Sequence, residues 1–330
     1  MLGTNLTLAA NLLRNDQVVA MPTETVYGLA GNAMSSTAVA RIFEAKNRPL
    51  FDPLIVHIAD IAQIDQLATN VSPTARKLMT AFWPGPLTIL LPKQDTVPDL
   101  VTSSLPEVGL RMPNHPLALE LIRIAGVPVA APSANLFGRI SPTTAQHVED
   151  QLGDRIDYIL DGGPCQVGVE STIIRAHDDK IEVLRFGGIT IEDLQQATGL
   201  PVITATCTID ESTGQPMSAP GMLTSHYAPL TPIEIIDPLE LIPRLHQSSH
   251  QRIGLLIGQP IESPLSSNVI LECLSPTGNL VEMAANFFAA LRRLDAANLD
   301  ILYATPFPDR GLGRALNDRL ERAAAKTTGI

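Results

Sequence analysis

Residues 22–58 constrain the fold more than any other stretch of the chain. An apolar run over 18–21 leads into this stretch, and a second run over 54–57 closes it. Between the two runs, a cluster of serine and threonine can cap a helix over 35–46. The stretch therefore predicts strand, helix and strand, with polar side chains following each element. Ligands bind at such strand ends in α/β sheets, and paired cations with upstream hydroxyls suit a polyphosphate.

The rest of the first 200 residues continues this alternation of apolar patterns. Further helices are expected over 6–14, 61–68, 73–82, 115–125, 144–152 and 191–197, and further strands over 87–91, 108–112, 127–131, 158–160, 171–174 and 181–186. The last two strands form a predicted hairpin, which interrupts a purely doubly wound pattern. We therefore predict an α/β fold with a twisted, mixed open sheet.

A chain of 330 residues is long enough for two domains. Residues 200–230 are rich in Thr, Ser, Pro and Gly and exceed the ~12–15 residues of an ordinary loop, which predicts a linker. His226 and Tyr227 within it suggest a docked lid. Strands over 233–236, 253–257, 269–274 and 301–303 and helices over 280–297 and 315–325 predict a smaller, Rossmann-like α/β domain. The predicted division is 1–199, 200–230 and 231–330.

Composition argues against several classes of protein. The chain is 45% hydrophobic and 17% charged with a net charge of −11, which indicates a packed protein without the basic surface of a nucleic-acid binder. Its three cysteines lie far apart, which favours a reducing compartment over a disulfide framework. No apolar run reaches the ~18 residues of a membrane helix. We expect a cytoplasmic protein with no membrane contact and no strong direct nucleic-acid binding.

The chain lacks the motifs of a Walker A loop, a dinucleotide-binding GxGxxG turn, a nucleophile elbow and a zinc protease. Its seven histidines show no metal-ligand spacing, so we expect no metal held directly by the protein. What remains is a set of Ser, Thr, Asn, Lys and Arg residues at predicted strand ends. Such residues hold anions through many hydrogen bonds, and nucleotidyl transfer depends mainly on positioning and charge.

Taken singly, each of these polar residues has a structural explanation at least as plausible as a functional one. Cations at a helix C-terminus complement its dipole, an arginine at a strand end often forms a surface ion pair, and serine or asparagine forms turns. Taken together, seven polar clusters at strand ends in one domain favour a binding site.

Several ordered motifs resemble a known family. They are PTETVYGL (22–29), the Lys46–Pro49 segment, PLIVHI (53–58), WPGPLT (83–88), GLRMP (109–113), APSAN (131–135) and GVESTI (168–173). This set resembles the YrdC-like domain. The PGM and HYAP motifs within 220–229 and GLGRALNDRLERAA (311–324) further resemble the two-domain type of L-threonylcarbamoyladenylate synthase.

The resemblance implies a nucleotidyltransferase that makes threonylcarbamoyl-AMP from L-threonine, bicarbonate and ATP, with release of pyrophosphate. It implies Mg²⁺ as the cofactor, held through the ATP phosphates and not by protein ligands. The product would pass to a downstream tRNA threonylcarbamoyl transferase complex, which forms N6-threonylcarbamoyladenosine in tRNA.

The resemblance also implies roles for the residues that match the family's motifs. The implied catalytic residues are Lys46 and Arg48. Contacts with ATP are implied for Arg48, Asp52, Ser133, Asn135, Ser141, Arg185 and Ala219. Contacts with threonine are implied for Thr25, His57, Arg111, Ala131 and Ser171, and Thr23 can join either set. The implied lid residues are His226 and Tyr227.

The chain departs from the family pattern at three positions. Asp52 stands before Pro53 where the family commonly has asparagine, and an aspartate repels phosphates unless Mg²⁺ intervenes. Glu107 and Phe186 are also atypical, so a ligand contact of Asp52 or Glu107 stays open. Two other functions stay open: a YrdC-like RNA-binding module without nucleotidyl transfer, and a carbamoyl transferase for another acceptor. The acidic charge argues against the first, and the absence of zinc-finger motifs argues against the second.

Overall fold

The computed structural model describes residues 1–205, 217, 219–221, 223 and 225–325. The chain forms two compact units. The first unit comprises Met1–Phe137, Ser141–Gln166 and Glu170–Met222, and the second comprises Gly138–Ile140, Val167–Val169 and Leu223–Ile330. The predicted linker at 200–230 thus contributes to both units, and its residues 206–216, 218, 222 and 224 lie outside the described part.

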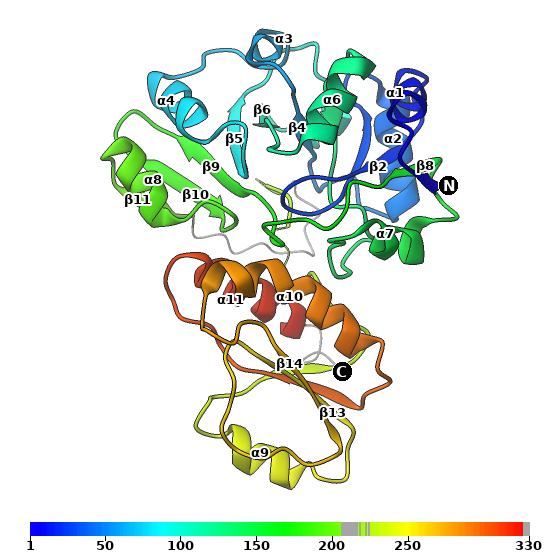
Figure 1. Ribbon diagram of the computed structural model, residues 1–330. Helices are drawn as coiled ribbons and strands as arrows, with labels where there is room; N and C mark the ends of the chain where they lie inside the picture. The colour runs from blue at the N-terminus through cyan, green and yellow to red at the C-terminus, as the bar shows by residue number, and fades with distance from the viewer. Residues whose placement is uncertain (206–216, 218, 222, 224, 326–330) are drawn as a thin grey trace. The chain divides into compact units, whose positions relative to one another are not determined.

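A large mixed sheet forms the centre of the first unit, which confirms the predicted fold class (Figure 1). Its strands are Leu2–Gly3 (β1), Val19–Met21 (β2), Gly28–Asn32 (β3), Ile55–His57 (β4), Leu87–Pro92 (β5), Glu107–Arg111 (β6), Val129–Ala130 (β7), Tyr158–Leu160 (β8), Thr172–Ala176 (β9), Ile181–Arg185 (β10) and Val202–Thr204 (β11). Among the described residues these 11 strands lie in the order β1-β8-β2-β3-β7-β4-β6-β5-β9-β10-β11. β4 runs parallel to β6 and antiparallel to β7, so neighbouring strands point both ways.

Most helices of the first unit lie where the sequence predicts them, although the short helix Asp99–Thr102 is not predicted. They are Leu6–Arg14 (α1), Ser36–Lys46 (α2), Ile64–Leu67 (α3), Pro73–Phe82 (α4), Asp99–Thr102 (α5), Pro116–Ala125 (α6), Ala145–Leu152 (α7) and Ile191–Thr198 (α8). The Ser35 side chain accepts a hydrogen bond from the Ala38 N–H and so caps α2. α6 ends at Gly126, whose φ of 72° is a left-handed conformation that glycine adopts without strain.

The sequence patterns do not predict β3 or β11. β3 has the sequence GLAGN, and its two glycines give it a low strand propensity. It is nevertheless central, because it pairs with both β2 and β7. β11 lies inside the predicted linker and pairs in parallel with β10. The ordered part of the first unit therefore continues beyond residue 199.

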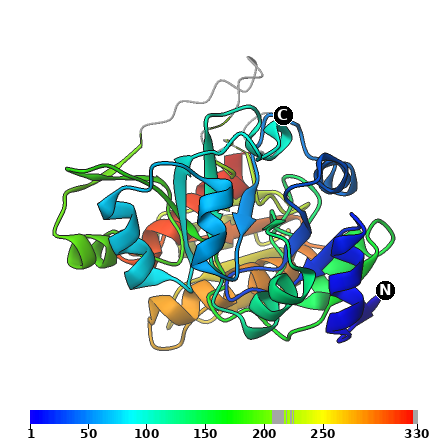
Figure 2. The same cartoon turned by 90° about the horizontal axis from the view of Figure 1, so that it is seen from above.

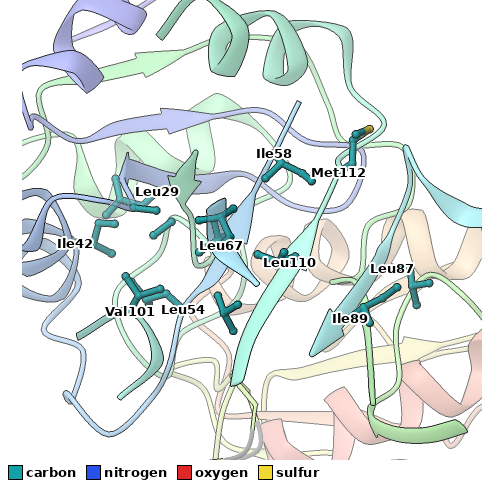
Figure 3. Packing of buried hydrophobic residues seen from close by; sticks show 14 of the residues in the cluster. Leu29, Ile42, Leu54, Ile58, Leu67, Leu87, Ile89, Val101, Leu110 and Met112 are labelled. Atoms are coloured by element: carbon teal, nitrogen blue, oxygen red, sulfur yellow. The ribbon is translucent and has the colours of Figure 1, made fainter. Parts of the chain in front are cut away.

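One face of this sheet carries the main hydrophobic core (Figure 3). Leu29, Ile89 and Leu110 extend into this core from β3, β5 and β6 and are fully buried. Helices α2 and α4 cover this face through Ile42 and Leu78. Fully burying one such side chain stabilises the fold by about 1.5–3 kcal/mol, so this core fixes the positions of the central strands.

The opposite face of the sheet divides into an apolar half and a polar half. On the apolar half, Leu13 of α1 and Leu121 of α6 pack against Val19 of β2 and Val129 of β7. Figures 1 and 2 both place α1 and α8 at opposite ends of this sheet. The polar half covers β4, β6 and β5, where His57, Arg111 and Thr88 lie on the face opposite Leu110 and Ile89.

The second unit has a parallel sheet with helices on both faces (Figure 1). Its elements are Ile233–Ile235 (β12), Leu241–Gln247 (α9), Ile253–Ile257 (β13), Val269–Cys273 (β14), Leu280–Asp295 (α10), Ile301–Ala304 (β15) and Leu312–Ala324 (α11). Its described strands lie in the order β12-β15-β13-β14. The layers agree with the predicted small α/β domain, but this order does not establish a Rossmann-like topology. Across the described parts of the chain, no helix is long and apolar enough to span a membrane.

Candidate active site

The polar half of the sheet face gathers several of the residues expected to bind ligands. His57 of β4 and Arg111 of β6 are direct neighbours in the sheet. Side chains alternate between the faces of a strand, which places Thr88 of β5 and Ser171 on the same face, and their hydroxyl oxygens lie 2.8 Å apart. A side chain at Gly109 would crowd this surface, because an added Cβ would lie 3.3 Å from Thr88 Cγ2.

The mixed topology of the sheet determines which ends of the strands carry the predicted site residues. Because β4 and β7 are antiparallel, His57 at the end of β4 pairs with Val129 at the start of β7. Ala131, which follows β7, donates its backbone N–H to the Ile55 carbonyl at the start of β4. Predicted site residues therefore lie at both ends of these central strands.

Arg111 contacts residues of two other sequence motifs, PTETVYGL and WPGPLT. Its Nη2 lies 2.7 Å from Glu24 Oε2 and donates to Thr25 Oγ1 at 3.0 Å, while its Nε donates to the Gly85 carbonyl at 3.3 Å. Thr23 Oγ1 lies 2.8 Å from Thr25 Oγ1. All four of these side chains are buried. Glu24 belongs to the PTETVYGL motif, but the sequence does not predict it as a site residue. The structure adds it through its contact with Arg111.

His57 is neutral at physiological pH. Burial lowers the pKa of His57 to about 3, and the neighbouring Arg111 charge lowers it further. Its Nδ1 has no hydrogen-bond partner among the described residues. The imidazole can therefore offer a ligand a hydrogen bond without a charge.

Arg185, the last residue of β10, holds Ser171 in place. Its Nε and Nη2 donate to the Ser171 carbonyl at 3.2 and 2.9 Å, and its Nη2 also donates to Ser171 Oγ at 3.1 Å. Its Nη1 donates to the Pro220 carbonyl at 3.0 Å. Ala219, the residue before Pro220, is fully buried. Arg185, which is expected to bind ATP, therefore contacts Ser171, which is expected to bind threonine. Ala219, also expected to bind ATP, directly precedes the residue whose carbonyl Arg185 binds.

Lys46 anchors the segment that follows β7. Its side chain is buried, and its Nζ donates to the carbonyls of Ser133 and Asn135, both at 2.5 Å. Burial, followed by the charge of Arg48, lowers the pKa of Lys46 well below its usual value. The structure thus brings three residues expected to serve ATP together, while a direct contact of Lys46 with phosphate stays a prediction.

Arg48 and Asp52 form a buried ion pair with an Nη2–Oδ2 distance of 2.8 Å. Arg48 also donates to the carbonyls of Asp52 and Pro53. Burial raises the pKa of Asp52 to about 6, although the charges of Arg48, Lys46 and Arg185 oppose this shift. Asp52 therefore lies within electrostatic reach of all three cations expected to serve ATP.

Two further carboxylates belong to the motifs or lie near them, Glu170 and Glu107, and each has its own partner. Ser141 Oγ donates to Glu170 Oε1 at 2.6 Å, both side chains are buried, and Glu170 directly precedes Ser171 in the chain. Glu107 pairs with Arg175 at 2.7 Å on the sheet. Arg175 also pairs with Glu182 at 2.6 Å. Glu107 is thus engaged in an ion-pair network across β6, β9 and β10.

The two residues of the predicted lid are anchored in the second unit. Tyr227 is 1% exposed, and its ring lies 5.6 Å from that of Phe288 on α10. The Arg319 guanidinium of α11 lies 5.3 Å from the Tyr227 ring centroid. The His226 ring meets Tyr227 edge-on at 4.1 Å. This segment is therefore docked, as predicted, but its function as a lid stays a prediction.

Within the described part of the chain, no three His, Cys, Asp or Glu side chains form a possible metal centre. The buried carboxylates near the site are each engaged by a neighbouring side chain: Glu24 by Arg111, Asp52 by Arg48 and Glu170 by Ser141. This donor set fits a metal that is held through the phosphates of a ligand and not by the protein.

Comparisons with known proteins agree with this fold. Residues 11–187 match the family model described as telomere recombination, and residues 189–325 match that of the threonylcarbamoyl-AMP synthase C-terminal domain. A threonylcarbamoyl-AMP synthase of Bacillus subtilis is 44% identical over 321 residues, which cover 96% of this chain and 92% of the relative. The synthase of Pyrococcus abyssi is 39% identical over 325 residues, which cover 96% and 93% of the two chains.

A solved structure extends the similarity to three dimensions. The crystal structure of P. abyssi Sua5 complexed with L-threonine matches with a TM-score of 0.87 and 37% identity, covering 98% of this chain and 94% of that one. Fold and site together define a nucleotidyltransferase-type enzyme built on a YrdC-like domain. The chain belongs to the threonylcarbamoyl-AMP synthase family, which confirms the resemblance found in its motifs.

Proposed function

We propose that this chain forms threonylcarbamoyl-AMP and pyrophosphate from L-threonine, bicarbonate and ATP. The observation that carries the proposal is the presence of two buried cation centres in one sheet domain, one at Arg111 with Thr25 and one at Arg48 with Asp52 and Arg185. A reaction that joins an amino acid to a nucleotide needs separate sites for a carboxylate and for phosphates. The names of relatives that match nearly the whole chain support this assignment.

The proposal places threonine at the Arg111 centre. A guanidinium presents a planar set of donors that matches a carboxylate. Thr25, Ser171 and neutral His57 add uncharged hydrogen-bonding groups around it. Arg111 also pairs with Glu24, so a carboxylate lies close to where the amino group of threonine would sit. The small side chain of Ala131 would leave room for the substrate.

The proposal places the ATP phosphates at the second centre. Threonine and bicarbonate would first condense to a carbamate with loss of water. A carbamate oxygen would then attack the α-phosphorus, and the bond from that phosphorus to the bridging oxygen would break, so that pyrophosphate leaves with the electron pair. Arg48 and Arg185 would stabilise the charge on that leaving group. Ser171 bonds to Arg185 and to Thr88, which lies on the strand next to that of Arg111, and this suits in-line positioning of both substrates.

We propose that Mg²⁺ is held through the ATP phosphates, since the nearby carboxylates already have partners. When bound, Mg²⁺ neutralises phosphate charge. His226 and Tyr227 would exclude water from the labile carbamate and mixed anhydride. The product would pass to a tRNA threonylcarbamoyl transferase complex, and a cytoplasmic location stays a prediction.

Pyrophosphate release from ATP tests the proposed function. We expect release when threonine, bicarbonate and Mg²⁺ are all present, and a return to background when either threonine or bicarbonate is omitted. Release that does not depend on threonine would rule out this synthase activity. Binding of tRNA at low salt without any ATP turnover would instead favour the RNA-binding module.

A further inference from the structure

The second unit contains a cavity of about 650 Å³ that the proposed reaction does not use. Residues that follow three parallel strands line it: Pro238 after β12, Gly258 after β13 and Thr305 after β15. Small-molecule sites in proteins commonly have volumes of roughly 300–1,000 Å³. The cavity is therefore large enough for an organic ligand of nucleotide size.

The cavity lies where neighbouring strands send the chain to opposite faces of the sheet. After β12 the chain passes to α9, whose Leu241 and Leu245 pack against Ile253 and Leu255 on one face. After the neighbouring strand β15 the chain passes to α11, which packs beside α10 on the other face. The crevice between two such strands is the usual ligand site of parallel α/β sheets, because no connection crosses it.

A largely buried threonine lines this cavity. Thr305 lines the cavity and is 8% exposed. Its hydroxyl makes no hydrogen bond with any described residue. The Thr305 hydroxyl is therefore available to bond to a ligand in the cavity.

The charges around the cavity favour an anion. Arg310 lines it, forms no ion pair within the described residues, and has no carboxylate among the other described lining residues. This is unusual for a chain with a net charge of −11. α11 begins next to Arg310 with Gly311 at its N-cap, no side-chain cap and no acidic residue in its first turn. The Gly313 N–H donates to the Arg310 carbonyl at 2.9 Å, so the Arg310 guanidinium, beside the positive end of the α11 dipole, is the group that can bind a phosphate.

The remaining wall of the cavity is apolar. Met283, Phe307 and Leu241 line it and are buried. Apolar walls combined with a few placed polar groups are typical of sites for organic ligands. Inorganic phosphate alone would leave this apolar wall uncovered, whereas a nucleotide base would cover it.

We propose that this cavity binds a nucleoside monophosphate. The phosphate would lie at Arg310 and the start of α11, the ribose would bond to the Thr305 hydroxyl, and the base would pack on Phe307 and Met283. The proposal rests only on the second unit and does not depend on the reaction proposed for the first.

Hydrogen–deuterium exchange on the full chain tests the proposal, with AMP as the probe, because this method reports each segment separately. We expect AMP to slow exchange at 257–261 and 305–313, and expect inorganic phosphate and adenosine to bind more weakly. Thr305→Val keeps the side-chain shape and removes the hydroxyl, and Arg310→Ala removes the charge. Each should weaken AMP protection of these segments at least tenfold, which corresponds to about 1.4 kcal/mol.

Thr231→Val is the matched control, because Thr231 is also 8% exposed but precedes β12 at the other end of the sheet. It should leave AMP protection unchanged. The proposal is overturned if AMP protects neither segment, if adenosine or inorganic phosphate binds as tightly as AMP, or if neither Thr305→Val nor Arg310→Ala weakens binding. If Thr305→Val lowers the melting temperature, the AMP protection of Arg310→Ala alone decides between the two outcomes, because Arg310 is exposed and its removal should leave the fold intact.

Discussion

Because Arg48 and Asp52 form a buried ion pair, substituting Arg48 alone changes both activity and stability. Arg48→Ala should abolish most nucleotidyl transfer, but it also leaves the Asp52 carboxylate buried without its ion partner. Removing one member of a buried pair costs about 3–5 kcal/mol, so we expect this variant to unfold at lower urea. Arg48→Ala combined with Asp52→Asn should recover much of the lost stability and still lack activity. Wild-type pyrophosphate release by the double variant would refute the role of Arg48.

The lowered pKa of His57 predicts a pH-dependent contribution to stability. The unfolded chain protonates this histidine near pH 6.5, whereas the folded protein does so only near pH 3. Between these values the unfolded state binds more protons, so the folded state loses stability as pH falls, by up to about 1.4 kcal/mol per pH unit. Asp52 opposes this trend between about pH 4 and 6, because its folded pKa is raised.

A comparison of variants isolates the His57 contribution from that of Asp52. The unfolding free energy of wild type minus that of His57→Asn should decrease as pH is lowered from 6.5 towards 4. A difference that stays constant over this range would show that His57 is not held neutral in the fold. Urea denaturation at several pH values supplies both curves.

At the scale of elements, the sequence predicts strands and helices that carry their own local signals. The serine and threonine cluster predicts a helix start at 35 and the helix over 115–125 predicts an end at 125, and both predictions are confirmed. β3 was missed because GLAGN has no strand propensity, and its tertiary partners β2 and β7 determine its conformation. The sequence likewise identifies Arg111 and Thr25 but not Glu24 as their partner, because strand direction and register bring them together.

The packing of Gly187 against the segment before β9 gives an element-scale prediction. A Cβ added at Gly187 would lie 2.3 Å from the Glu170 carbonyl oxygen and 2.4 Å from the Ser171 carbonyl carbon. Gly187→Ala must therefore shift the backbone that carries Ser171, at a cost of about 1–3 kcal/mol. We expect a raised KM for threonine in steady-state pyrophosphate release.

Gly126→Ala is the matched control for that substitution. Its φ is 72°, and an added Cβ would meet nothing within 4 Å. It should cost about 1 kcal/mol of stability through backbone strain and leave the KM for threonine unchanged. An unchanged KM in Gly187→Ala would contradict the position assigned to Ser171.

At the scale of the whole molecule, a chain that keeps only the first domain should end after β11, and not at the predicted boundary of residue 199. A chain cut after residue 199 loses β11, whereas a chain of residues 1–205 keeps it, together with the Ala205 N–H bond to the Val183 carbonyl. We expect residues 1–205 to remain folded by circular dichroism but to synthesise product weakly, because Arg185 loses the Pro220 carbonyl and the predicted lid is absent. Full activity of the truncated chain would show that the segment after 205 is not needed for synthesis.

The origin of the carbonyl carbon distinguishes the proposed synthesis from any other activation of threonine by ATP. The full chain is incubated with ATP, L-threonine, Mg²⁺ and ¹³C-labelled bicarbonate, and the products are measured by mass spectrometry. The account predicts an adduct that contains AMP, threonine and one ¹³C atom, formed together with pyrophosphate. Threonine linked to AMP without the label, or AMP and pyrophosphate with no labelled adduct, would contradict it.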